Sequence, residues 1–231
     1  MKNYGRNLYY TGHPIADMLM DDTSHFSNPW KKQKIQGKKK IIWAPHHTIG
    51  VSYDIGHFGN FLKYCDFMLE LAGETKDNVQ WAFKPHPVLR QKLQYLWGKE
   101  RTDAYYEKWA NMENTQLEDG EYIGLFRYSD AMIHDSASFI IEYLYMRKPC
   151  LFMENGNNHN FNQTTQKAHD LHEQCYGKDD VRKFVQNVID GVDTKKAERE
   201  QFFHDCLLPP NGRSASDNII AAILGEPPYD N

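Results

Sequence analysis

Short apolar runs alternate with longer amphipathic stretches from residue 39 onward. Four runs of four to six mostly apolar residues predict strands, at 40–45, 79–83, 131–134 and 149–153. Residues 58–71 show helical periodicity, and further helices are expected at 88–97, 103–112, 122–128, 136–146, 180–190, 194–206 and 214–224. Strands that alternate with helices in this way indicate βαβ units, so we predict an α/β fold with a parallel sheet.

The first 38 residues lack this regularity. Residues 7–12, NLYYTG, predict a short strand that ends in a turn, and residues 21–38 are polar and irregular. Six lysines lie between Lys31 and Lys40. We interpret them as a solvated linker, in preference to a weak attachment to an anionic membrane surface. We therefore expect a linker in the first 38 residues, and residues 39–231 to form one domain with C-terminal helices.

Polar side chains gather where the predicted strands end. The segments are PHHT (45–48), KPHP (84–87), HDS (134–136) and ENGNN (154–158). In open parallel sheets, ligands bind outside the carboxyl ends of the strands. Because these segments would meet at one edge of one sheet, we expect them to form a shared binding site.

The stretch SDAMIHDSASFIIE (129–142) places an acid and two serines between a strand and a helix expected to start at Ser136. The free N–H groups at a helix start favour phosphate, and Ser136 and Ser138 would add hydroxyl donors. Glu142 lies one helical turn after Ser138, where its carboxylate could accept hydrogen bonds from a ribose. The alternative is structural: Asp135 or Ser136 would simply cap the helix, a contribution of about 1 kcal/mol.

The histidines also have simple structural explanations. His86, between two prolines, could only shape a turn, and His46 and His47 could be satisfied loop residues. His169 and His172, with Cys175, show helical spacing in HDLHEQC, and we favour a surface or partly buried helix there over a metal site. The convergence of three strand ends on one edge favours a functional site for the other histidines.

Composition narrows the function. The chain has 231 residues, 40% of them hydrophobic and 25% charged, with a net charge of -4. That charge argues against nucleic-acid binding, which needs a basic field. No apolar run approaches the length of a membrane-spanning helix, and the N-terminus does not look like a signal peptide. The four cysteines form no CxxC pair and are expected to be reduced thiols of a cytoplasmic protein.

Several of these segments, taken in order, resemble a known family. WAPHHTI, FKPHP, SDAMIHDSASFIIEYLYMRKPCLFME and NGRSASDNII resemble the CDP-glycerol:poly(glycerophosphate) glycerophosphotransferases, the teichoic-acid and capsule polymerases with a GT-B fold. The resemblance covers roughly residues 5–225 and implies the C-terminal nucleotide-binding half of that fold, a Rossmann-like parallel sheet with helices on both faces. Because GRNLYYTGHPIADML (5–19) resembles the family's interdomain crossing, the resemblance also implies that residues 1–38 are a crossing segment and linker. It implies further that an N-terminal domain, which supplies part of the acceptor site, is missing here.

The resemblance implies a reaction and a set of residues. Glycerol phosphate, or a related polyol phosphate, would pass from CDP-glycerol to a hydroxyl of a polymer or lipid-linked acceptor. No acidic cluster in the sequence looks like a magnesium site, so we predict that the reaction needs no metal and no other cofactor. The enzyme would be cytoplasmic, with peripheral association at the inner face of the membrane because the family's substrates are lipid-linked. The catalytic candidates are His46, His47 and His86, and the substrate-binding candidates are Lys84, Asp135, Ser136, Ser138 and Glu142.

The implied roles differ between these residues. His46 or His47 would be the base or a phosphate ligand, and His86 with Lys84 would steady the diphosphate. Departures from the family pattern include Ala137, where a serine is usual, and Asn218, where an arginine is common. Two alternatives stay open: a sugar transferase or UDP-sugar 2-epimerase of the same fold, and a non-catalytic nucleotide-binding domain that needs a partner.

Overall fold

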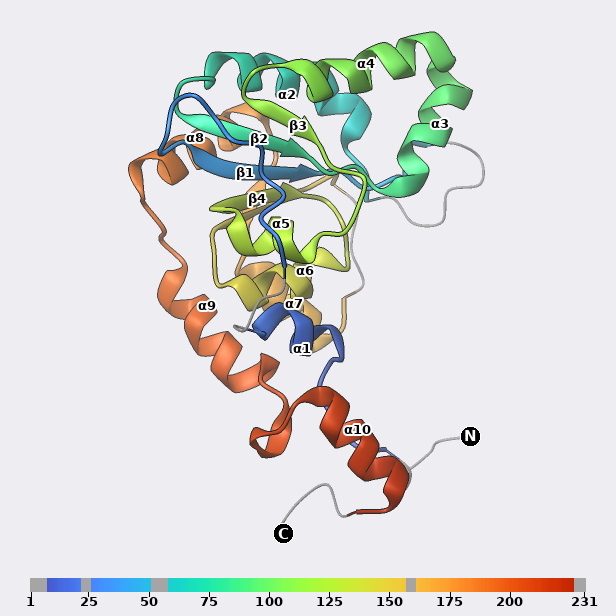
Figure 1. Ribbon diagram of the computed structural model, residues 1–231, viewed down its shortest axis with the longest axis vertical. Helices are drawn as coiled ribbons and strands as arrows, with labels where there is room; N and C mark the ends of the chain where they lie inside the picture. The colour runs from blue at the N-terminus through green and yellow to red at the C-terminus, as the bar shows by residue number, and fades with distance from the viewer. Residues whose placement is uncertain (1–7, 22–25, 51–57, 157–160, 227–231) are drawn as a thin grey trace.

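The computed structural model describes residues 8–21, 26–50, 58–156 and 161–226. Its centre is one six-stranded sheet in the order β3-β2-β1-β4-β5-β6, and every neighbouring pair is parallel (Figure 1). This is the strand order of doubly wound Rossmann folds, in which the order reverses beside β1. The strands are β1 (Lys39–Ala44), β2 (Val79–Phe83), β3 (Thr115–Leu117), β4 (Ala131–His134), β5 (Cys150–Met153) and β6 (Glu173–Cys175).

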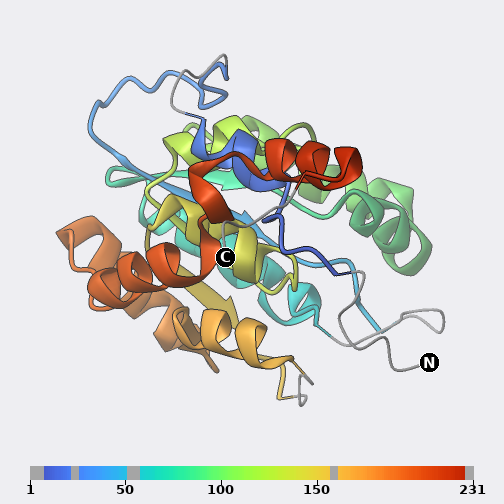
Figure 2. The same cartoon turned by 90° about the horizontal axis from the view of Figure 1, so that it is seen from below.

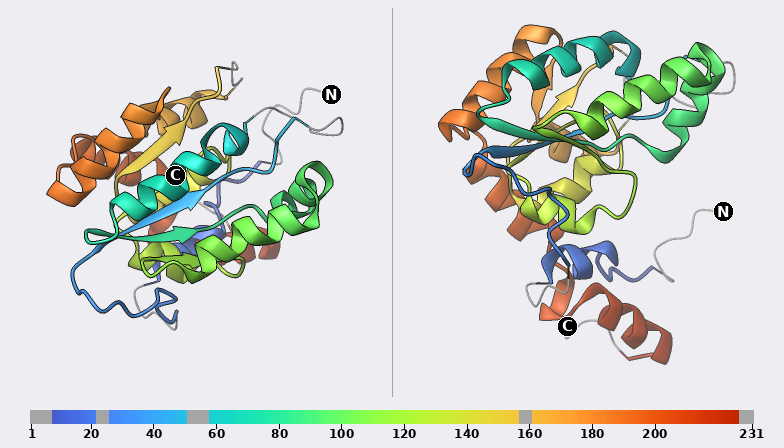
Figure 3. Two further views of the ribbon diagram at one scale, coloured as in Figure 1. Left: turned by 90° about the horizontal axis from the view of Figure 1, so that it is seen from above. Right: turned by 45° about the horizontal axis from the view of Figure 1, so that its top comes forward.

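Alternation along the strands divides the core into two layers. In β1, Ile41 and Trp43 face one cluster while Ile42 and Ala44 face the other. The first layer is covered by α2 (Phe61–Glu74), α3 (Pro87–Trp97), α4 (Lys99–Asn111) and α8 (Lys178–Asp190). The second is covered by α1 (Ile15–Met20), α5 (Ile123–Tyr128), α6 (Phe139–Glu142), α7 (Gln163–Asp170) and α9 (Lys196–Phe202) (Figures 1 and 3).

An aromatic cluster holds the first layer together. The Trp43 ring lies 5.7 Å from that of Phe61, 5.0 Å from that of Phe83 and 5.4 Å from that of Trp109, measured between centroids. Large rings packed at these distances contribute beyond their buried area. The cluster joins β1, β2, α2 and α4, and so fixes the two strands whose ends carry the histidines and Lys84.

Most predicted elements are confirmed within a few residues, including the strands at 79–83 and 131–134. Four elements were missed: α1, α7 and the three-residue strands β3 and β6. The expected strand at 7–12 is wrong for residues 8–12, which have no regular structure, and residue 7 lies outside the described residues. The expected helix at 136–146 starts later, at Phe139, and after one α-helical turn continues as the 3-10 helix Tyr143–Met146.

The stretch before β1 is attached to the sheet. Trp30 is buried and its indole N–H donates to the Leu125 carbonyl over 3.2 Å. The Lys31 amide donates to Gln116 Oε1 over 2.8 Å, and Gln80 Nε2 donates to the Lys31 carbonyl over 2.8 Å. These bonds link residues 30–31 to β2, β3 and α5, so this part of the expected linker packs against the domain.

The two ends of the described chain pack together away from the sheet. The last helix, α10 (Ala215–Leu224), lies beside α1 and the segment that leads into it (Figure 2). Asp17 of α1 accepts hydrogen bonds from the Ala215 amide (2.8 Å), the Ser216 amide (2.8 Å) and the Ser216 hydroxyl (2.6 Å). Asn218, at the position where the resembled family commonly has arginine, is buried and donates to the Thr11 carbonyl over 3.3 Å.

Replacing Asp17 should loosen this junction. Asp17→Asn leaves one carboxylate oxygen fewer for the exposed N–H groups of α10, so we expect unfolding free energy to fall by about 1–2 kcal/mol in urea titration. Amide hydrogen exchange in α10 should rise. Asp77→Asn, in an exposed turn, is the matched control and should leave both measurements unchanged. Equal stability of the two variants would contradict the capping role.

None of the described helices combines the length and the apolar character that crossing a membrane requires.

Candidate functional site

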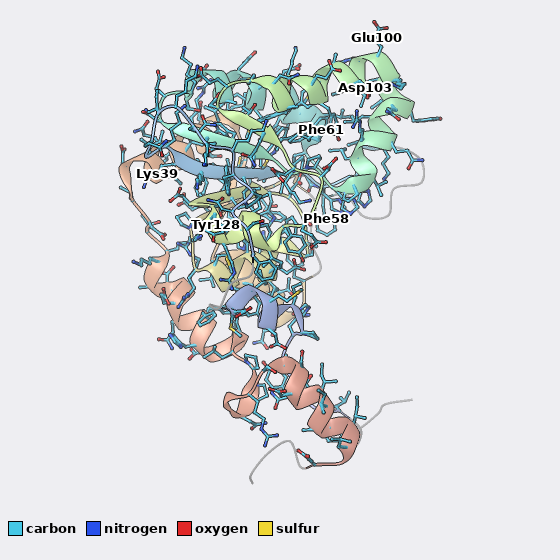
Figure 4. All side chains as sticks on the ribbon, viewed as in Figure 1. Lys39, Phe58, Phe61, Glu100, Asp103 and Tyr128 are labelled. Carbon is cyan, nitrogen blue, oxygen red and sulfur yellow. The ribbon has the colours of Figure 1, made fainter. Side chains whose placement is uncertain are left out.

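A cavity of about 310 Å³ opens at the carboxyl ends of β1, β2 and β4 and is closed on one side by the loop that follows β3. In Figure 4, Lys39 at the start of β1 and Phe58, which follows the loop after β1, mark opposite edges of the sheet. The cavity belongs to the Phe58 edge, since the Phe58 ring lies 5.7 Å from the His46 ring. This is the position expected for a ligand in a doubly wound sheet. Its walls are formed by Ala44, Pro45, His46, Lys84, Pro85, His86, Pro87, Asp119, Gly120, Glu121, Tyr122, Ser136, Ser138, Phe139 and Glu142.

The structure brings most of the sequence-derived candidates into this one cavity. Its lining includes His46, Lys84, His86, Ser136, Ser138 and Glu142. Two candidates are elsewhere. His47 packs against His86, and the Asp135 side chain is buried in the protein.

The buried carboxylate of Asp135 accepts hydrogen bonds from backbone amides beside the cavity. The sequence had suggested that this residue contacts substrate or caps a helix. Its carboxylate accepts the His46 amide and the Asn60 amide, each over 2.6 Å, and the residue is 1% exposed. Burial raises the pKa of this carboxyl to about 6, against the opposing effect of those hydrogen bonds. Asp135 therefore ties the end of β4 to the loop after β1 and to the start of α2.

Residues on either side of the segment 51–57 are joined by a second set of hydrogen bonds. The Thr48 hydroxyl accepts the Phe58 amide over 3.1 Å and the Gly59 amide over 2.8 Å. A side chain at position 59 would place its Cβ 2.0 Å from the Thr48 carbonyl oxygen, so this approach requires glycine. Because both acceptor positions of the Thr48 hydroxyl are filled, its proton points to His46 Nδ1, 3.1 Å away.

The three histidines form a cluster whose hydrogen bonds define their tautomers. The His47 ring lies 4.2 Å from that of His46 and 4.4 Å from that of His86. Lys92 Nζ, 2.9 Å from His47 Nδ1, can only donate, and His86 Nδ1 accepts the Val88 amide over 3.2 Å as the N-cap of α3. With the Thr48 bond, each Nδ1 is an acceptor, so each neutral ring carries its proton on Nε2.

The structural explanation for His86 is therefore correct in part, because it caps α3. Burial and the neighbouring His47, Lys92 and Lys84 lower its pKa, so the ring is neutral near pH 7. The cap uses only Nδ1, which leaves the Nε2–H edge of a cavity-lining residue as a hydrogen-bond donor.

Lys84 supplies positive charge to the cavity from a largely buried position. Its backbone amide donates to the Trp43 carbonyl over 2.8 Å, which extends the β1–β2 pairing by one residue. The side chain is 7% exposed, and burial lowers its pKa while Glu118, Asp119 and Glu121 act in the opposite direction. A buried cation beside a ligand-sized cavity suits an anionic ligand.

Glu142 presents an unused acceptor. One carboxylate oxygen is engaged by the Tyr122 hydroxyl, and the other, Oε2, is buried without a hydrogen-bond partner. Burial raises the pKa of Glu142, and the Tyr122 hydrogen bond lowers it. A buried acceptor without a partner carries a free-energy cost, and such atoms in native structures often mark the place of a ligand or ion.

Ser136 and Ser138 both lie at the cavity, but the helix does not start at Ser136 as the sequence predicted. Ser136 Oγ and Ser138 Oγ are 3.1 Å apart and both residues line the cavity. The Ser136 amide, which a helix beginning at that residue would leave free for phosphate, donates instead to His134 Nδ1 over 3.2 Å. Since α6 is a single turn that begins at Phe139, the hydroxyls rather than a helix N-terminus are the donors here.

The HDLHEQC segment is not the helix that its spacing suggested. α7 ends at Asp170, His172 lies in a turn, and Cys175 is in β6. His172 is fully buried, and His169 is nearly so and lies 2.9 Å from Glu154 Oε1, measured from Nε2. Of the ENGNN segment, residues 157 and 158 lie outside the described residues. Within the described part of the chain, no three histidine, cysteine or acidic side chains converge as metal ligands would.

The loop from 119 to 122 is the part of the site that sequence reasoning missed. It follows β3, whose three residues are too short to give a periodic signal, so its position at the sheet edge was not evident. Asp119, Gly120, Glu121 and Tyr122 all line the cavity. The signal that could have found it is the acidic, glycine-containing stretch EDGEY directly before a predicted helix.

Comparison with known proteins gives a consistent result. A family model described as CDP-Glycerol:Poly(glycerophosphate) glycerophosphotransferase matches residues 2–225. The teichoic acid ribitol-phosphate polymerase TarL of Staphylococcus aureus (strain NCTC 8325 / PS 47) is 24% identical over 159 residues, which make up 64% of this chain and 25% of TarL. The chain thus spans about a quarter of the length of this relative.

Solved structures share the fold. A structure of the wall teichoic acid polymerase TagF with CDPG matches with a TM-score of 0.50 at 17% identity, over 83% of this chain and 44% of that one. The S. aureus MnaA–UDP co-structure matches with a TM-score of 0.52 at 17% identity, over 96% of this chain and 56% of that one. Both matches show the fold, and both cover about half of the longer chain. The fold class expected from the sequence, a Rossmann-like half of a GT-B fold, is confirmed.

The family model covers nearly the whole chain, and three of the four segments that resembled the family contribute residues to one cavity, whereas the fourth, NGRSASDNII, packs against the N-terminal segment. The chain belongs to the CDP-glycerol:poly(glycerophosphate) glycerophosphotransferase family, a family of transferases that includes teichoic acid polymerases.

Proposed function

We propose that this chain is the donor-binding half of an enzyme that transfers glycerol phosphate, or a related polyol phosphate, from CDP-glycerol to an acceptor hydroxyl in teichoic-acid or capsule synthesis. The observation that carries the proposal is that Glu142, whose Oε2 is buried without a partner, lines a cavity that is also lined by Lys84 and two serines. A nucleoside diphosphate offers the complementary groups, hydroxyls for the carboxylate and phosphates for the cation and hydroxyls.

The arrangement suggests where each part of the donor would lie. The ribose would hydrogen-bond to Glu142, and the diphosphate would lie against Ser136, Ser138 and Lys84. Glu142 follows Ser138 by one turn, since the Glu142 amide donates to the Ser138 carbonyl over 3.2 Å. This spacing lets one short segment hold adjacent ribose and phosphate groups.

The reaction would be displacement at phosphorus. The acceptor oxygen forms a new bond to the β-phosphorus, the bond from that phosphorus to the bridging oxygen breaks so that CMP leaves with the bonding electrons, and the proton of the acceptor hydroxyl passes to solvent water. Charge spreads over the phosphoryl oxygens in the transition state, so fixed donors there lower the barrier. Lys84 and the Nε2–H groups of His46 and His86 are our candidates for those donors.

The tautomers change the role proposed for the histidines. A neutral ring with hydrogen on Nε2 donates at that atom and cannot accept a proton there. We therefore propose that His46 and His86 act as donors to phosphoryl oxygens rather than as the base. His47, whose Nδ1 accepts from Lys92, would support the cluster from behind.

The acceptor side of the reaction is part of the same proposal. The relative TarL is about four times as long as the matched segment, and the solved structures are about twice as long. We propose that an N-terminal domain supplies part of the acceptor site, and that the complete enzyme meets a polymer or lipid-linked acceptor at the inner face of the membrane. No nucleic acid, metal or further cofactor is part of this proposal.

Calorimetric titration of the purified chain with CDP-glycerol, CMP, UDP-N-acetylglucosamine and UMP tests the donor. We expect both cytidine ligands to bind and both uridine ligands to bind at least about 10-fold more weakly, the equivalent of one lost hydrogen bond of about 1.4 kcal/mol. A uridine preference would support a sugar transferase or epimerase instead. Absence of binding by any of the four at millimolar concentration would contradict the claim that this half holds the donor unaided.

A further inference from the structure

Two histidines outside the cavity form a buried chain of hydrogen bonds. His134 closes β4 and His172 lies in the turn between α7 and β6, and both side chains are completely buried. His172 Nε2 lies 3.0 Å from the Ile140 carbonyl, His172 Nδ1 lies 3.1 Å from His134 Nε2, and His134 Nδ1 lies 3.2 Å from the Ser136 amide. Every ring nitrogen of the pair therefore has a polar neighbour at hydrogen-bond distance.

Only one placement of the protons satisfies the whole chain. A carbonyl can only accept, so His172 Nε2 must carry hydrogen, and in the neutral ring its Nδ1 is then an acceptor. His134 must in turn donate from Nε2, which leaves its Nδ1 to accept the Ser136 amide. The Ser136 carbonyl is also 3.2 Å from His134 Nδ1, but a bond to it would require the other tautomer.

Both ends of this chain lie on the short segment that carries the serines. One end holds the Ser136 amide and the other holds the Ile140 carbonyl in the first turn of α6. Ser136 Oγ and Ser138 Oγ, 3.1 Å apart, lie between these two points in the chain. The pair thus fixes the five-residue span of backbone from Ser136 to Ile140, and Ser136 and Ser138 of that span line the cavity.

We propose that His134 and His172 are positioning residues, a neutral histidine clamp that sets the orientation of Ser136 and Ser138 for the phosphate groups of the donor. The inference rests on the proposed function for the identity of the ligand, whereas the clamp itself rests on the three hydrogen bonds above. His172 comes from a part of the sequence more than thirty residues away, is not a lining residue of the cavity, and bonds to His134 and to the Ile140 carbonyl.

The surroundings of the pair favour uncharged rings. Burial lowers the pKa of His134 to about 3, and it lowers the pKa of His172 as well. The charged and titratable groups around the pair are His169, which is paired with Glu154, Arg199, which is paired with Asp193, and Lys195, whose Nζ donates to the His172 carbonyl over 2.8 Å. Neither ring is therefore available as a proton carrier near pH 7, which suits a fixed support and not an acid or base.

The structural half of the proposal is tested by nitrogen-15 NMR of the histidine side chains in the full chain. We expect His134 and His172 to be neutral Nε2–H tautomers from pH 8 down to pH 5, and the Ser136 amide to exchange slowly. In His172→Phe, Ser136 exchange should accelerate by about 10-fold or more, because the chain of donors is broken. An Nδ1–H tautomer in either wild-type ring, or unchanged Ser136 exchange in His172→Phe, would overturn the clamp.

The functional half uses the dissociation constant of CDP-glycerol. We expect His172→Phe to weaken binding by about 10-fold, and His172→Asn, whose amide oxygen can replace Nδ1 as acceptor, to recover most of that loss. Phe184→Leu, a buried change in α8 on the opposite layer, is the matched control for lowered stability and should bind normally. Equal affinity of His172→Phe and wild type would overturn the positioning role. If wild type itself does not bind CDP-glycerol, the proposed function fails, and the NMR result still decides the clamp.

Discussion

Replacing Glu142 by glutamine is expected to weaken CDP-glycerol binding by about 10- to 100-fold, since hydrogen bonds to a charged group contribute about 1.5–3 kcal/mol. The glutamine keeps the size of the side chain but loses the negative charge and one of its two acceptors. The oxygen concerned, Oε2, is the buried acceptor without a partner. Calorimetry measures the loss directly, and circular dichroism verifies that the variant is folded.

A variant of Tyr122 distinguishes the effect of the Glu142 carboxylate from that of the tyrosine hydroxyl bonded to it. Tyr122→Phe removes the hydroxyl that engages Glu142 but keeps the ring, which packs 4.9 Å from Phe126 and 5.5 Å from Phe139. It should weaken binding by only about 3- to 10-fold, because the carboxylate stays charged and in place. Wild-type affinity in Glu142→Gln would exclude a ribose contact at this position. A Tyr122→Phe loss as large as that of Glu142→Gln would mean that the tyrosine itself contacts the donor.

Lowering the pH from 6.5 to 4.5 should reduce the free energy of unfolding of the wild type by about 2–3 kcal/mol more than that of a His134→Gln variant. The reason is that one proton taken up on unfolding changes this free energy by about 1.4 kcal/mol per pH unit. The pKa of His134 in the folded protein is about 3, below the value of 6.5 for an unperturbed histidine. The contribution of His134 to the free energy of unfolding is therefore fully present above pH 6.5. It is lost as the pH falls toward 3, because in this range the unfolded chain binds a proton at His134 and the folded protein does not.

The comparison with a variant is needed because other groups titrate over the same range. Burial raises the pKa of Asp135 from 3.8 to about 6, so Asp135 acts in the opposite sense and favours the folded state as the pH falls from 6 to 3.8. His172 acts in the same sense as His134. The Asp135 contribution is common to wild type and variant and cancels in the difference, which urea titrations at several pH values measure. A difference independent of pH would show that His134 titrates normally.

Backbone amides around the site are held by buried side chains. Asp135 takes the amides of His46 and Asn60, and His134 takes the amide of Ser136. Such bonds replace water around groups that would otherwise be costly to bury. The rigidity of the cavity wall thus comes from residues that do not themselves line it.

The amino-acid sequence by itself determined the class of fold and the region of the site. Apolar runs at 79–83 and 131–134 could only be buried strands between amphipathic helices, and parallel strands bring their carboxyl ends to one edge. That geometry was enough to place His46, Lys84, His86, Ser136, Ser138 and Glu142 around a common cavity. The local pattern carries this information because strand and helix periods differ and each buries one face.

The tertiary structure alone decided what each polar side chain does. Asp135 and Ser136 are neighbours in the sequence. The Asp135 carboxylate is buried and accepts backbone amides, whereas Ser136 lines the cavity. His172 joins His134 across 38 positions of sequence, and Tyr122 reaches Glu142 through a loop that follows a three-residue strand. Hydrogen bonds and burial depend on contacts between distant segments, and no local spacing specifies which of two adjacent polar residues turns inward.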